Sequence, residues 1–258
     1  MALLSIKNLT KNFGGLCANS NISMEIDDGE LVGLIGPNGA GKTTLFNMLT
    51  GVYEPSEGTI DFVRDGKEVR LNGKKPYVVT ALGLARTFQN IRLFQNLSVI
   101  DNVKIAMNKD VKCGVVASIL RFPMFFKEEE RIEKEALELL DILHLADKKD
   151  ELACNLPYGE QRRLEIARAL ATRPKLLFLD EPAAGMNPQE TAELTQLIRR
   201  IKDEFHISVL LIEHDMSLVM NLCERIYVLD YGKCIASGTP AEIQTNKRVI
   251  EAYLGEEV

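Results

Sequence analysis

The sequence predicts an α/β protein that combines a parallel sheet, an antiparallel β segment and a helical segment. Its 258 residues, 46% of them hydrophobic, are enough to bury a large core as one domain or two lobes. Three observations predict the fold: alternating runs near the N-terminus, a helical period in the middle of the chain, and near-continuous apolar runs after Pro174.

The first part of the chain, up to about residue 85, mixes antiparallel strands with one buried strand and a helix. Residues 3–9 and 20–26 alternate in polarity, as half-buried strands do. The segment 59–79 is short, charged and punctuated by glycine, which is typical of further antiparallel ribbons. The inward positions of the second run are Ile22, Met24 and Ile26.

From Val99 to Ala171 the apolar residues follow a helical period, which predicts a helical lobe. One predicted face consists of Ile132, Ala136, Leu139, Leu140 and Leu143. A shorter amphipathic helix is expected from about Gly238. Its apolar positions are Ile243, Val249, Ile250, Tyr253 and Leu254.

Three late strands are predicted by runs of apolar residues without alternation. They cover 176–179, 209–212 and 226–229, and a helix is expected from about Pro188 to Glu204. Such runs suit a parallel sheet with both faces covered.

Composition and charge narrow the class of protein. A balance of 31 basic and 37 acidic residues, or −6, argues against a surface dominated by nucleic-acid phosphate contacts. The five cysteines show no C-x-x-C spacing, so we expect free thiols in a reducing cytosol and no zinc site. The N-terminus lacks a signal-peptide pattern, and no export is expected.

The longest near-apolar stretch, residues 114–126, contains Ser118, Arg121 and Pro123. It falls short of the ~20 residues that a membrane-spanning helix needs. Two interpretations stay open: a helix and loop packed in the core, or an apolar surface for a partner.

A glycine-rich loop follows the apolar run 31–35 and matches the pattern G-x-x-x-x-G-K-[ST]. Glycines let backbone N–H groups converge on phosphate oxygens, and the helix that opens near Gly41 directs its positive end at them. Lys42 supplies a point charge and Thr43 is placed to hold Mg²⁺. We therefore predict a phosphate cradle rather than a simple turn. Its predicted contact residues are Gly36, Pro37, Asn38, Gly39, Ala40, Gly41, Lys42, Thr43 and Thr44.

Two carboxylates, Asp180 and Glu181, end the first of the late strands. Ligands of open α/β sheets bind at this edge. Asp180 can take Mg²⁺, and Glu181 is the natural partner for an attacking water, because phosphoryl transfer needs mostly positioning and charge stabilisation. By itself an Asp-Glu pair would only start a loop; the phosphate loop upstream favours the functional interpretation.

His214 and Gln89 are singled out by position alone. His214 follows the next strand and can donate to a γ-phosphate or orient a water. Gln89 lies at the junction of the predicted lobes, where its amide could reach Mg²⁺ or water.

Together these features resemble the ATP-binding cassette (ABC) family, the ATPase subunits of ABC transporters. The resemblance covers nearly the whole chain, and the motifs follow in family order. It implies that Phe13 stacks on adenine and that 36–43 is the Walker A loop. The other counterparts are the Q-loop Gln89, the signature segment 156–161, the Walker B Asp180, the catalytic Glu181, the D-loop 183–187 and the switch histidine His214.

The resemblance implies a P-loop NTPase fold with a RecA-like core, an antiparallel β subdomain and an α-helical subdomain in one ABC domain, 1–258. Residues 1–88 and 162–258 would form the core with the β subdomain, and 89–161 the helical subdomain. ATP and Mg²⁺ are the implied ligands, with Thr43, Gln89 and Asp180 as metal contacts.

A head-to-tail dimer is also implied, in which each ATP lies between the Walker A loop of one copy and the signature of the other. Tyr158, Gly159 and Glu160 would then contact the partner's ATP, because the helix after Gly159 begins with N–H groups that need an anion. The second cassette is either an identical chain or a LivF-like homologue.

The signature departs from the common Leu-Ser-Gly-Gly-Gln form. Pro157 replaces a serine whose hydroxyl would face phosphate, and Tyr158 replaces a glycine. Loss of one such donor costs about 10²- to 10³-fold in rate in other enzymes, although a phenol could supply a replacement contact. Asn187 stands in place of the usual D-loop aspartate.

The strings 156–170, 181–188 and 249–255, which include these departures, resemble those of the branched-chain amino-acid importer ATPases of the LivG type. The implied role is a peripheral subunit at the cytoplasmic face of a prokaryotic membrane. Integral permease subunits and, indirectly, an extracytoplasmic solute-binding protein would choose the solute, and no nucleic-acid partner is expected.

Two other functions stay open. A soluble ABC ATPase acting on nucleic acid or ribosomes would usually carry long coiled-coil arms or tandem cassettes, and neither is in the sequence. A nucleotide sensor that does not hydrolyse ATP is supported only by the altered signature.

Overall fold

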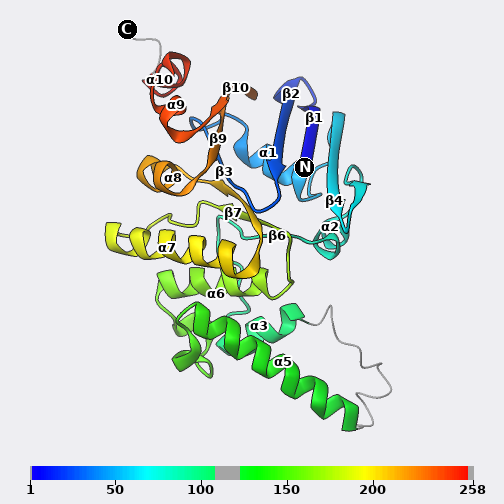
Figure 1. Ribbon diagram of the computed structural model, residues 1–258, viewed down its shortest axis with the longest axis vertical. Coiled ribbons are helices and arrows are strands. Elements are labelled where there is room, and N and C mark those ends of the chain that lie inside the picture. Colours follow the sequence, from blue (N-terminus) through cyan, green and yellow to red (C-terminus); the bar gives the residue numbers. More distant parts are fainter. Residues whose placement is uncertain (1, 108–122, 255–258) are drawn as a thin grey trace. The chain divides into compact units, whose positions relative to one another are not determined.

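The computed structural model describes residues 2–107 and 123–254, and the chain forms two compact units (Figure 1). Unit 1 comprises the chain up to Gln89 and from Lys175 onward, and unit 2 comprises Asn90–Pro174. The apolar stretch 114–126 lies largely outside the described residues.

Unit 1 contains a six-stranded sheet in the order β10-β9-β3-β8-β7-β6. All neighbours are parallel except β10, which pairs antiparallel with β9. The three late strands predicted from the sequence are confirmed, and β3, β7 and β8 are buried along their whole length. The bounds are β3 Leu31–Ile35, β6 Leu84–Arg86, β7 Leu176–Asp180, β8 Ser208–Ile212, β9 Arg225–Asp230 and β10 Lys233–Gly238.

An antiparallel sheet of four strands, in the order β2-β1-β4-β5, completes the β structure of unit 1. Its bounds are β1 Ala2–Phe13, β2 Leu16–Asp27, β4 Glu57–Arg64 and β5 Lys67–Arg70. The inward residues predicted in β2 are buried. The prediction of ribbon up to residue 79 is wrong at its end, where α2 (Pro76–Leu82) begins with Pro76 in its first turn and ends at Gly83 in the left-handed region.

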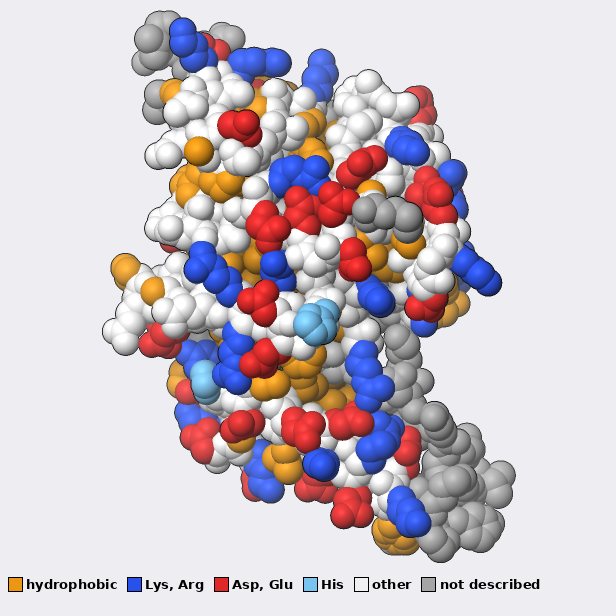
Figure 2. All heavy atoms as spheres, viewed as in Figure 1, with side chains coloured by type: hydrophobic (Ala, Val, Ile, Leu, Met, Phe, Trp, Pro, Cys, Tyr) orange, Lys and Arg blue, Asp and Glu red, His pale blue; other side chains and the backbone are white. Residues whose placement is uncertain are grey.

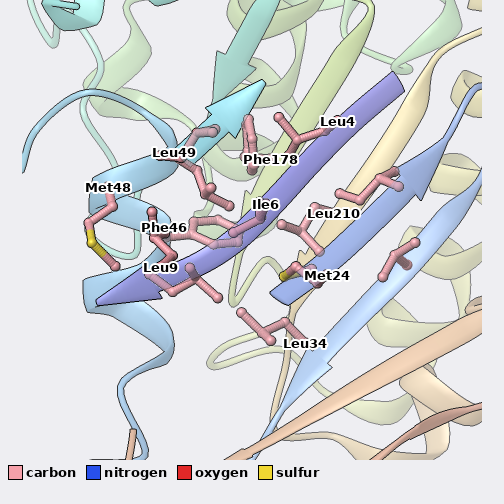
Figure 3. Close-up of a cluster of buried hydrophobic side chains, with 14 of the residues drawn as sticks. Leu4, Ile6, Leu9, Met24, Leu34, Phe46, Met48, Leu49, Phe178 and Leu210 are labelled. Atoms are coloured by element: carbon pink, nitrogen blue, oxygen red, sulfur yellow. The ribbon is translucent and has the colours of Figure 1, made fainter. Parts of the chain in front are cut away.

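One apolar cluster joins the two sheets and helix α1 (Lys42–Leu49) (Figure 3). It includes Ile6 and Met24 of the antiparallel sheet and Leu210 of the parallel sheet. Phe46 of α1 meets Phe178 of β7 edge to face, with ring centroids 5.3 Å apart. A buried phenyl ring is worth about 1.5–3 kcal/mol relative to an exposed one, so this cluster fixes α1 against one face of the parallel sheet.

The opposite face of the parallel sheet is covered by α8 (Met216–Leu222), with α7 (Pro188–Phe205) beside α8. Gly33 in β3 permits the close approach of α8, since a Cβ there would lie 2.9 Å from Cys223 Sγ and 3.3 Å from Val219 Cγ1. The single C-terminal helix predicted from Gly238 is two helices, α9 (Pro240–Gln244) and α10 (Lys247–Leu254).

Unit 2 is helical, as the 3.6-residue period predicted. Its elements are α3 Val99–Met107, α5 Pro123–Ile142, the short turns Ala146–Lys148 and Ala153–Asn155, and α6 Tyr158–Leu170. The face predicted for α5 and the residue after it is buried. Helix α6 groups with α3 and α5 in this unit, whereas the residues from 162 onward were expected in the core.

None of the helices in the described ranges combines the length and the apolar character of a membrane span. On the face shown in Figure 2, basic and acidic side chains alternate without a large area of one sign.

Candidate functional site

A cavity of about 530 Å³ opens in unit 1 at the carboxyl edge of β3 and β7. All the residues that line it belong to this unit. Among them are the predicted residues Phe13, Asn38, Gly39, Ala40, Gly41, Lys42, Thr43, Thr44, Gln89, Glu181 and His214. The structure therefore brings together residues that the sequence separates by up to 201 positions, since 214 − 13 = 201.

Two glycines let the loop between β3 and α1 pack closely against neighbouring segments of unit 1. A Cβ on Gly36 would lie 2.1 Å from the carbonyl oxygen of Leu229, and one on Gly41 would lie 2.5 Å from Asn19 Nδ2. Gly41 has a φ of 95° and directly precedes α1. The loop is thus held in a conformation in which the N–H groups that begin α1 face the cavity, as an anion site requires.

Lys42 carries a buried ammonium group within this loop. Its Nζ donates to the carbonyl oxygens of Gly36, at 2.6 Å, and Pro37, at 2.9 Å. Burial lowers the pKa of Lys42, and the nearby charges of Glu181 and Asp180 oppose that shift. A buried ammonium group that donates to neutral carbonyl groups is suited to a polyanionic ligand, because phosphate oxygens can replace those carbonyls and bring negative charge into direct contact with the cation.

The three residues predicted to be catalytic lie together, because Glu181 contacts both Gln89 and His214. The Oε2 of Glu181 accepts from Gln89 Nε2 at 3.0 Å, and its Oε1 lies 2.8 Å from His214 Nε2. Glu181 has a φ of 48°, in the left-handed region, and its N–H donates to the carbonyl of Ile212 at 2.9 Å. The carboxylate is thus fixed at both oxygens on the wall of the cavity that Lys42 also lines.

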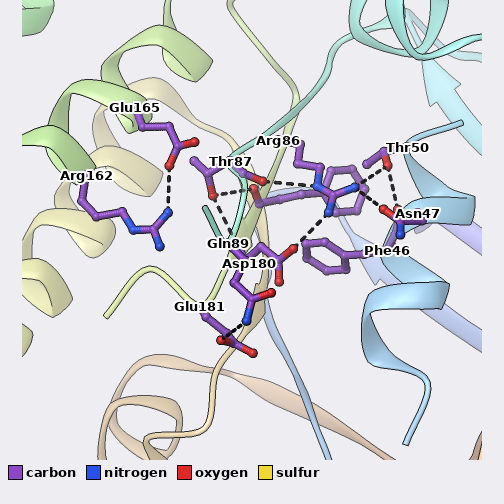
Figure 4. A network of polar contacts seen from close by, with 11 residues as sticks. Phe46, Asn47, Thr50, Arg86, Thr87, Gln89, Arg162, Glu165, Asp180 and Glu181 are labelled. Atoms are coloured by element: carbon purple, nitrogen blue, oxygen red, sulfur yellow. Dashed lines mark hydrogen bonds and ion pairs between the residues drawn. The ribbon is translucent and has the colours of Figure 1, made fainter. Parts of the chain in front are cut away.

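Asp180, at the end of β7, is buried and pairs with Arg86, with Arg86 Nη2 3.0 Å from Asp180 Oδ2 (Figure 4). The Asp180 N–H donates to Thr87 Oγ1 at 3.2 Å. Arg86 was not predicted as a site residue. Its only sequence signal is an arginine at the end of a short apolar strand, three residues before Gln89.

Glu213, directly before His214, is a second buried charged residue that was not predicted from the sequence. The buried carboxylate accepts from the N–H of Ala183 at 2.7 Å and from that of His214 at 3.0 Å. Burial raises the pKa of Glu213, hydrogen bonds from the backbone oppose the shift, and the charge of Glu181 adds to it. Glu213 thus connects the loop after Glu181 to the backbone of His214.

Phe13 ends β1 at the rim of the cavity and is 42% exposed, so its ring is available to a planar ligand. Tyr53 supports the ring edge-on, with centroids 5.3 Å apart, and Lys11 Nζ lies 5.0 Å from the Phe13 centroid.

The signature residues Tyr158, Gly159 and Glu160 lie in unit 2, in the first turn of α6. The helix begins after Pro157, which provides no side-chain cap. Glu160 pairs with Lys148, with both carboxylate oxygens 2.7 Å from Nζ. The hydroxyl of Tyr158 accepts from Arg162 at 3.3 Å.

Thr43, Gln89 and Asp180 offer a hydroxyl, an amide carbonyl and a carboxylate, all hard oxygen donors that suit Mg²⁺. No group of three or more His, Cys, Asp or Glu residues that could hold a metal is found in the part of the chain that the structure describes. The donor set fits Mg²⁺ held jointly by a few protein oxygens and a phosphate ligand, rather than in an all-protein cage.

Fold and site together define an ATP-binding cassette, and comparisons with known proteins agree. Residues 19–184 match the model of the ABC transporter family, and residues 233–258 match that of the branched-chain amino acid ATP-binding cassette transporters. The high-affinity branched-chain amino acid transport ATP-binding protein LivG of Salmonella typhimurium is 46% identical over 254 residues, covering 98% of each chain. This chain belongs to the family of LivG-type ABC transporter ATP-binding proteins.

Solved structures share the fold. The crystal structure of the ADP conformation of an ATP-binding cassette of an ABC transporter aligns with a TM-score of 0.82 and 31% identity, covering 99% of this chain and all of the other. A dimeric cassette in a post-hydrolysis state, bound to ADP and Pi, aligns with a TM-score of 0.75 and 25% identity, covering 92% of this chain and 98% of the other.

Proposed function

We propose that this chain binds and hydrolyses MgATP to energise the uptake of branched-chain amino acids through membrane permease subunits. The observation that carries the proposal is the Glu181 carboxylate, held by Gln89 and His214 in the cavity that Lys42 lines. A buried phosphate-binding lysine and a fixed carboxylate are what hydrolysis of a bound triphosphate requires.

Binding is assigned to the loop 36–44 and to Phe13. The N–H groups of the loop and the Lys42 ammonium hold the phosphates, and Phe13 stacks on the adenine. Lys42 exchanges its two carbonyl partners for phosphate oxygens, which relieves the penalty that burial places on its charge.

Hydrolysis is assigned to Glu181, which orients the attacking water and accepts its proton. Gln89 and His214 hold the carboxylate in place, and Asp180 and Thr43 provide oxygen donors for the metal. When bound, Mg²⁺ would neutralise charge that develops on the phosphate oxygens.

A second cassette, identical or LivF-like, would complete each site with Tyr158, Gly159 and Glu160. Helix α6 has 13 residues, and no side chain caps its start. The N–H of Glu160 donates to the Pro157 carbonyl, so the N–H groups of Tyr158 and Gly159 are the ones that suit a partner's phosphate. The similar dimeric cassette supports this arrangement.

The solute is proposed from the relatives, and the location from the role of a transporter's ATP-binding subunit. LivG is a branched-chain amino acid transport protein, so we assign the same class of solute here. The chain would act as a peripheral subunit at the cytoplasmic face of the membrane. Integral permease subunits and an extracytoplasmic binding protein would contact the amino acid.

The test is reconstitution of the chain with its membrane subunits and binding protein in proteoliposomes. We expect ATP-dependent leucine accumulation, no accumulation of lysine, and a loss of hydrolysis by about 10²- to 10⁴-fold in Glu181→Gln. Glu204→Gln, in an exposed pair with Arg200 on α7, is the matched control and should hydrolyse ATP at the wild-type rate.

Wild-type hydrolysis by the Glu181→Gln complex would refute the role of Glu181. ATP binding without hydrolysis in the wild type would instead favour a nucleotide sensor. ATP-driven transport that excludes branched-chain amino acids would overturn the solute assignment alone.

A further inference from the structure

Arg86 lies at the centre of a polar network that joins three segments of unit 1 (Figure 4). Besides the 3.0 Å contact with Asp180, its Nη1 donates to Asn47 Oδ1 at 2.6 Å and to Thr50 Oγ1 at 3.1 Å. Its Nε donates to the Thr87 carbonyl at 3.2 Å. All three guanidinium nitrogens are therefore engaged, each by a different part of the chain.

Two phenyl rings flank this guanidinium. Its central carbon lies 5.0 Å from the centroid of Phe88 and 5.7 Å from that of Phe46. The Arg86 side chain is 11% exposed, and that of Asp180 is 3% exposed. The guanidinium group is planar and packs on both rings, so Phe46 and Phe88 as well as Asp180 set its position.

The network connects the two elements that carry the proposed metal contacts. Helix α1 begins with Lys42 and Thr43, and its far end carries Asn47 and the C-cap Thr50. Strand β7 ends at Asp180. An eight-residue helix is a rigid rod of about 12 Å, so a brace at its far end also restrains its start.

We propose that Arg86 is a positioning residue for the metal half of the nucleotide site, holding the Asp180 carboxylate in register with the helix that carries Thr43. This rests on the proposed function, because it takes Asp180 and Thr43 as metal contacts. Residues behind metal ligands fix ligand orientation, and their loss typically lowers metal affinity by about 10- to 100-fold.

Fold stability alone is a weak explanation for the buried ion pair between Arg86 and Asp180. A buried ion pair contributes little net stability compared with apolar residues of similar volume, because desolvation offsets the attraction. The Arg86 guanidinium donates to the Asp180 carboxylate, the Asn47 amide and the Thr50 hydroxyl. These directional hydrogen bonds fix the orientation of the carboxylate, which apolar packing could not do.

The experiment separates metal-dependent from metal-independent ATP binding. The chain has no tryptophan, so the fluorescence of a ribose-labelled ATP analogue can be followed without tryptophan emission from this chain. We expect Arg86→Met and Arg86→Lys to raise the Kd measured with Mg²⁺ by about 10- to 100-fold. The Kd measured in EDTA should change by less than about threefold, because the loop and Lys42 are untouched.

Arg70→Met is the matched control. Arg70 pairs with Asp61 in the antiparallel sheet, away from the cavity lining, so its loss should leave both dissociation constants unchanged. Asn47→Leu is a second test variant, which keeps the proposal testable if Arg86→Met does not fold. It removes the shorter of the two hydrogen bonds that tie Arg86 to the far end of α1, keeps Arg86 and Asp180, and should produce the same selective defect, at least threefold.

Parallel loss of affinity with Mg²⁺ and with EDTA would overturn the proposal and leave Arg86 a structural residue. Unchanged Mg²⁺ dependence in both Arg86→Lys and Asn47→Leu would overturn it as well. A wild-type protein whose ATP affinity does not depend on Mg²⁺ would instead refute the metal assignment in the proposed function, whatever the variants show.

Discussion

Glu181 combines a strained backbone with a fixed side chain. Its φ of 48° is rare for a residue with a side chain, and such strain, of order 1–3 kcal/mol, persists where the surrounding contacts enforce it. The sequence could name Glu181, Gln89 and His214, because each lies at a strand end or a predicted junction. Their hydrogen bonds could not be predicted, since they join positions 92 and 33 residues apart.

Arg86 and Glu213 escaped sequence reasoning for a related reason. Each is one charged residue beside an apolar strand, with no spacing to mark it. The side-chain partners of Arg86 lie 36 to 94 residues away, so only the folded sheet reveals them. Buried charge networks of this kind are tertiary properties.

Two cysteines of unit 1 give a test at the scale of single residues. Cys17 is exposed and lines the nucleotide cavity, whereas burial raises the pKa of Cys223 to about 12 from the ordinary 9.0. We expect iodoacetamide at pH 8 to modify Cys17 and Cys154 and to spare Cys223, as read by peptide mass mapping. MgATP should protect Cys17 and leave Cys154, an exposed thiol of unit 2, unprotected.

The raised pKa of Cys223 makes the stability of the folded protein depend on pH in the alkaline range. The folded protein favours the protonated thiol, so this contribution to stability is complete below pH 9.0 and is lost as the pH rises towards about 12. Fast alkylation of Cys223 in the folded protein at pH 8, or labelling of Cys17 that ATP does not slow, would contradict the assignment.

At the scale of elements, the positions of the late strands were predicted better than the positions at which helices begin and end. The apolar runs of β7, β8 and β9 have no other interpretation in an α/β protein, whereas α2 was hidden in a glycine-rich segment. The C-terminal helix was predicted as one element. Each of the two helices has its own start: Thr239 and Glu242 form a capping box for α9, and the side chain of Asn246 accepts from the N–H of Arg248 where α10 begins.

Asn187, which stands in place of the usual D-loop aspartate, caps the start of helix α7. It is the N-cap of α7, and its side chain accepts from the N–H groups of Gln189 and Glu190 at 2.9 and 3.0 Å, in a capping box with Glu190. We expect Asn187→Ala to lower the free energy of unfolding by about 1 kcal/mol in urea denaturation. Asn187→Asp, which keeps the capping oxygens, should stay within about 0.5 kcal/mol. Equal losses in both would show that capping is not its role.

For the whole molecule, the sequence predicted an α/β core, an antiparallel sheet and a helical part, and the two described units contain them. The end of the helical part was not predictable. Helix α6 has a mixed burial pattern, and its grouping with α3 and α5 depends on packing that periodicity does not encode. The cavity is lined by residues of β1 and β2, of the loop before α1 and of the segments after β6, β7, β8 and β9, which only folding brings together.

The account depends on triphosphate binding by the loop that holds Lys42. Isothermal titration calorimetry of the purified chain with ATP, with and without Mg²⁺, tests this most directly. We expect saturable binding of one ATP per chain that strengthens with Mg²⁺. In Lys42→Ala the affinity should fall by about 100-fold, because a desolvated charge contact is worth roughly 2–5 kcal/mol. No saturable binding by the wild type, or equal affinity in Lys42→Ala, would contradict the account.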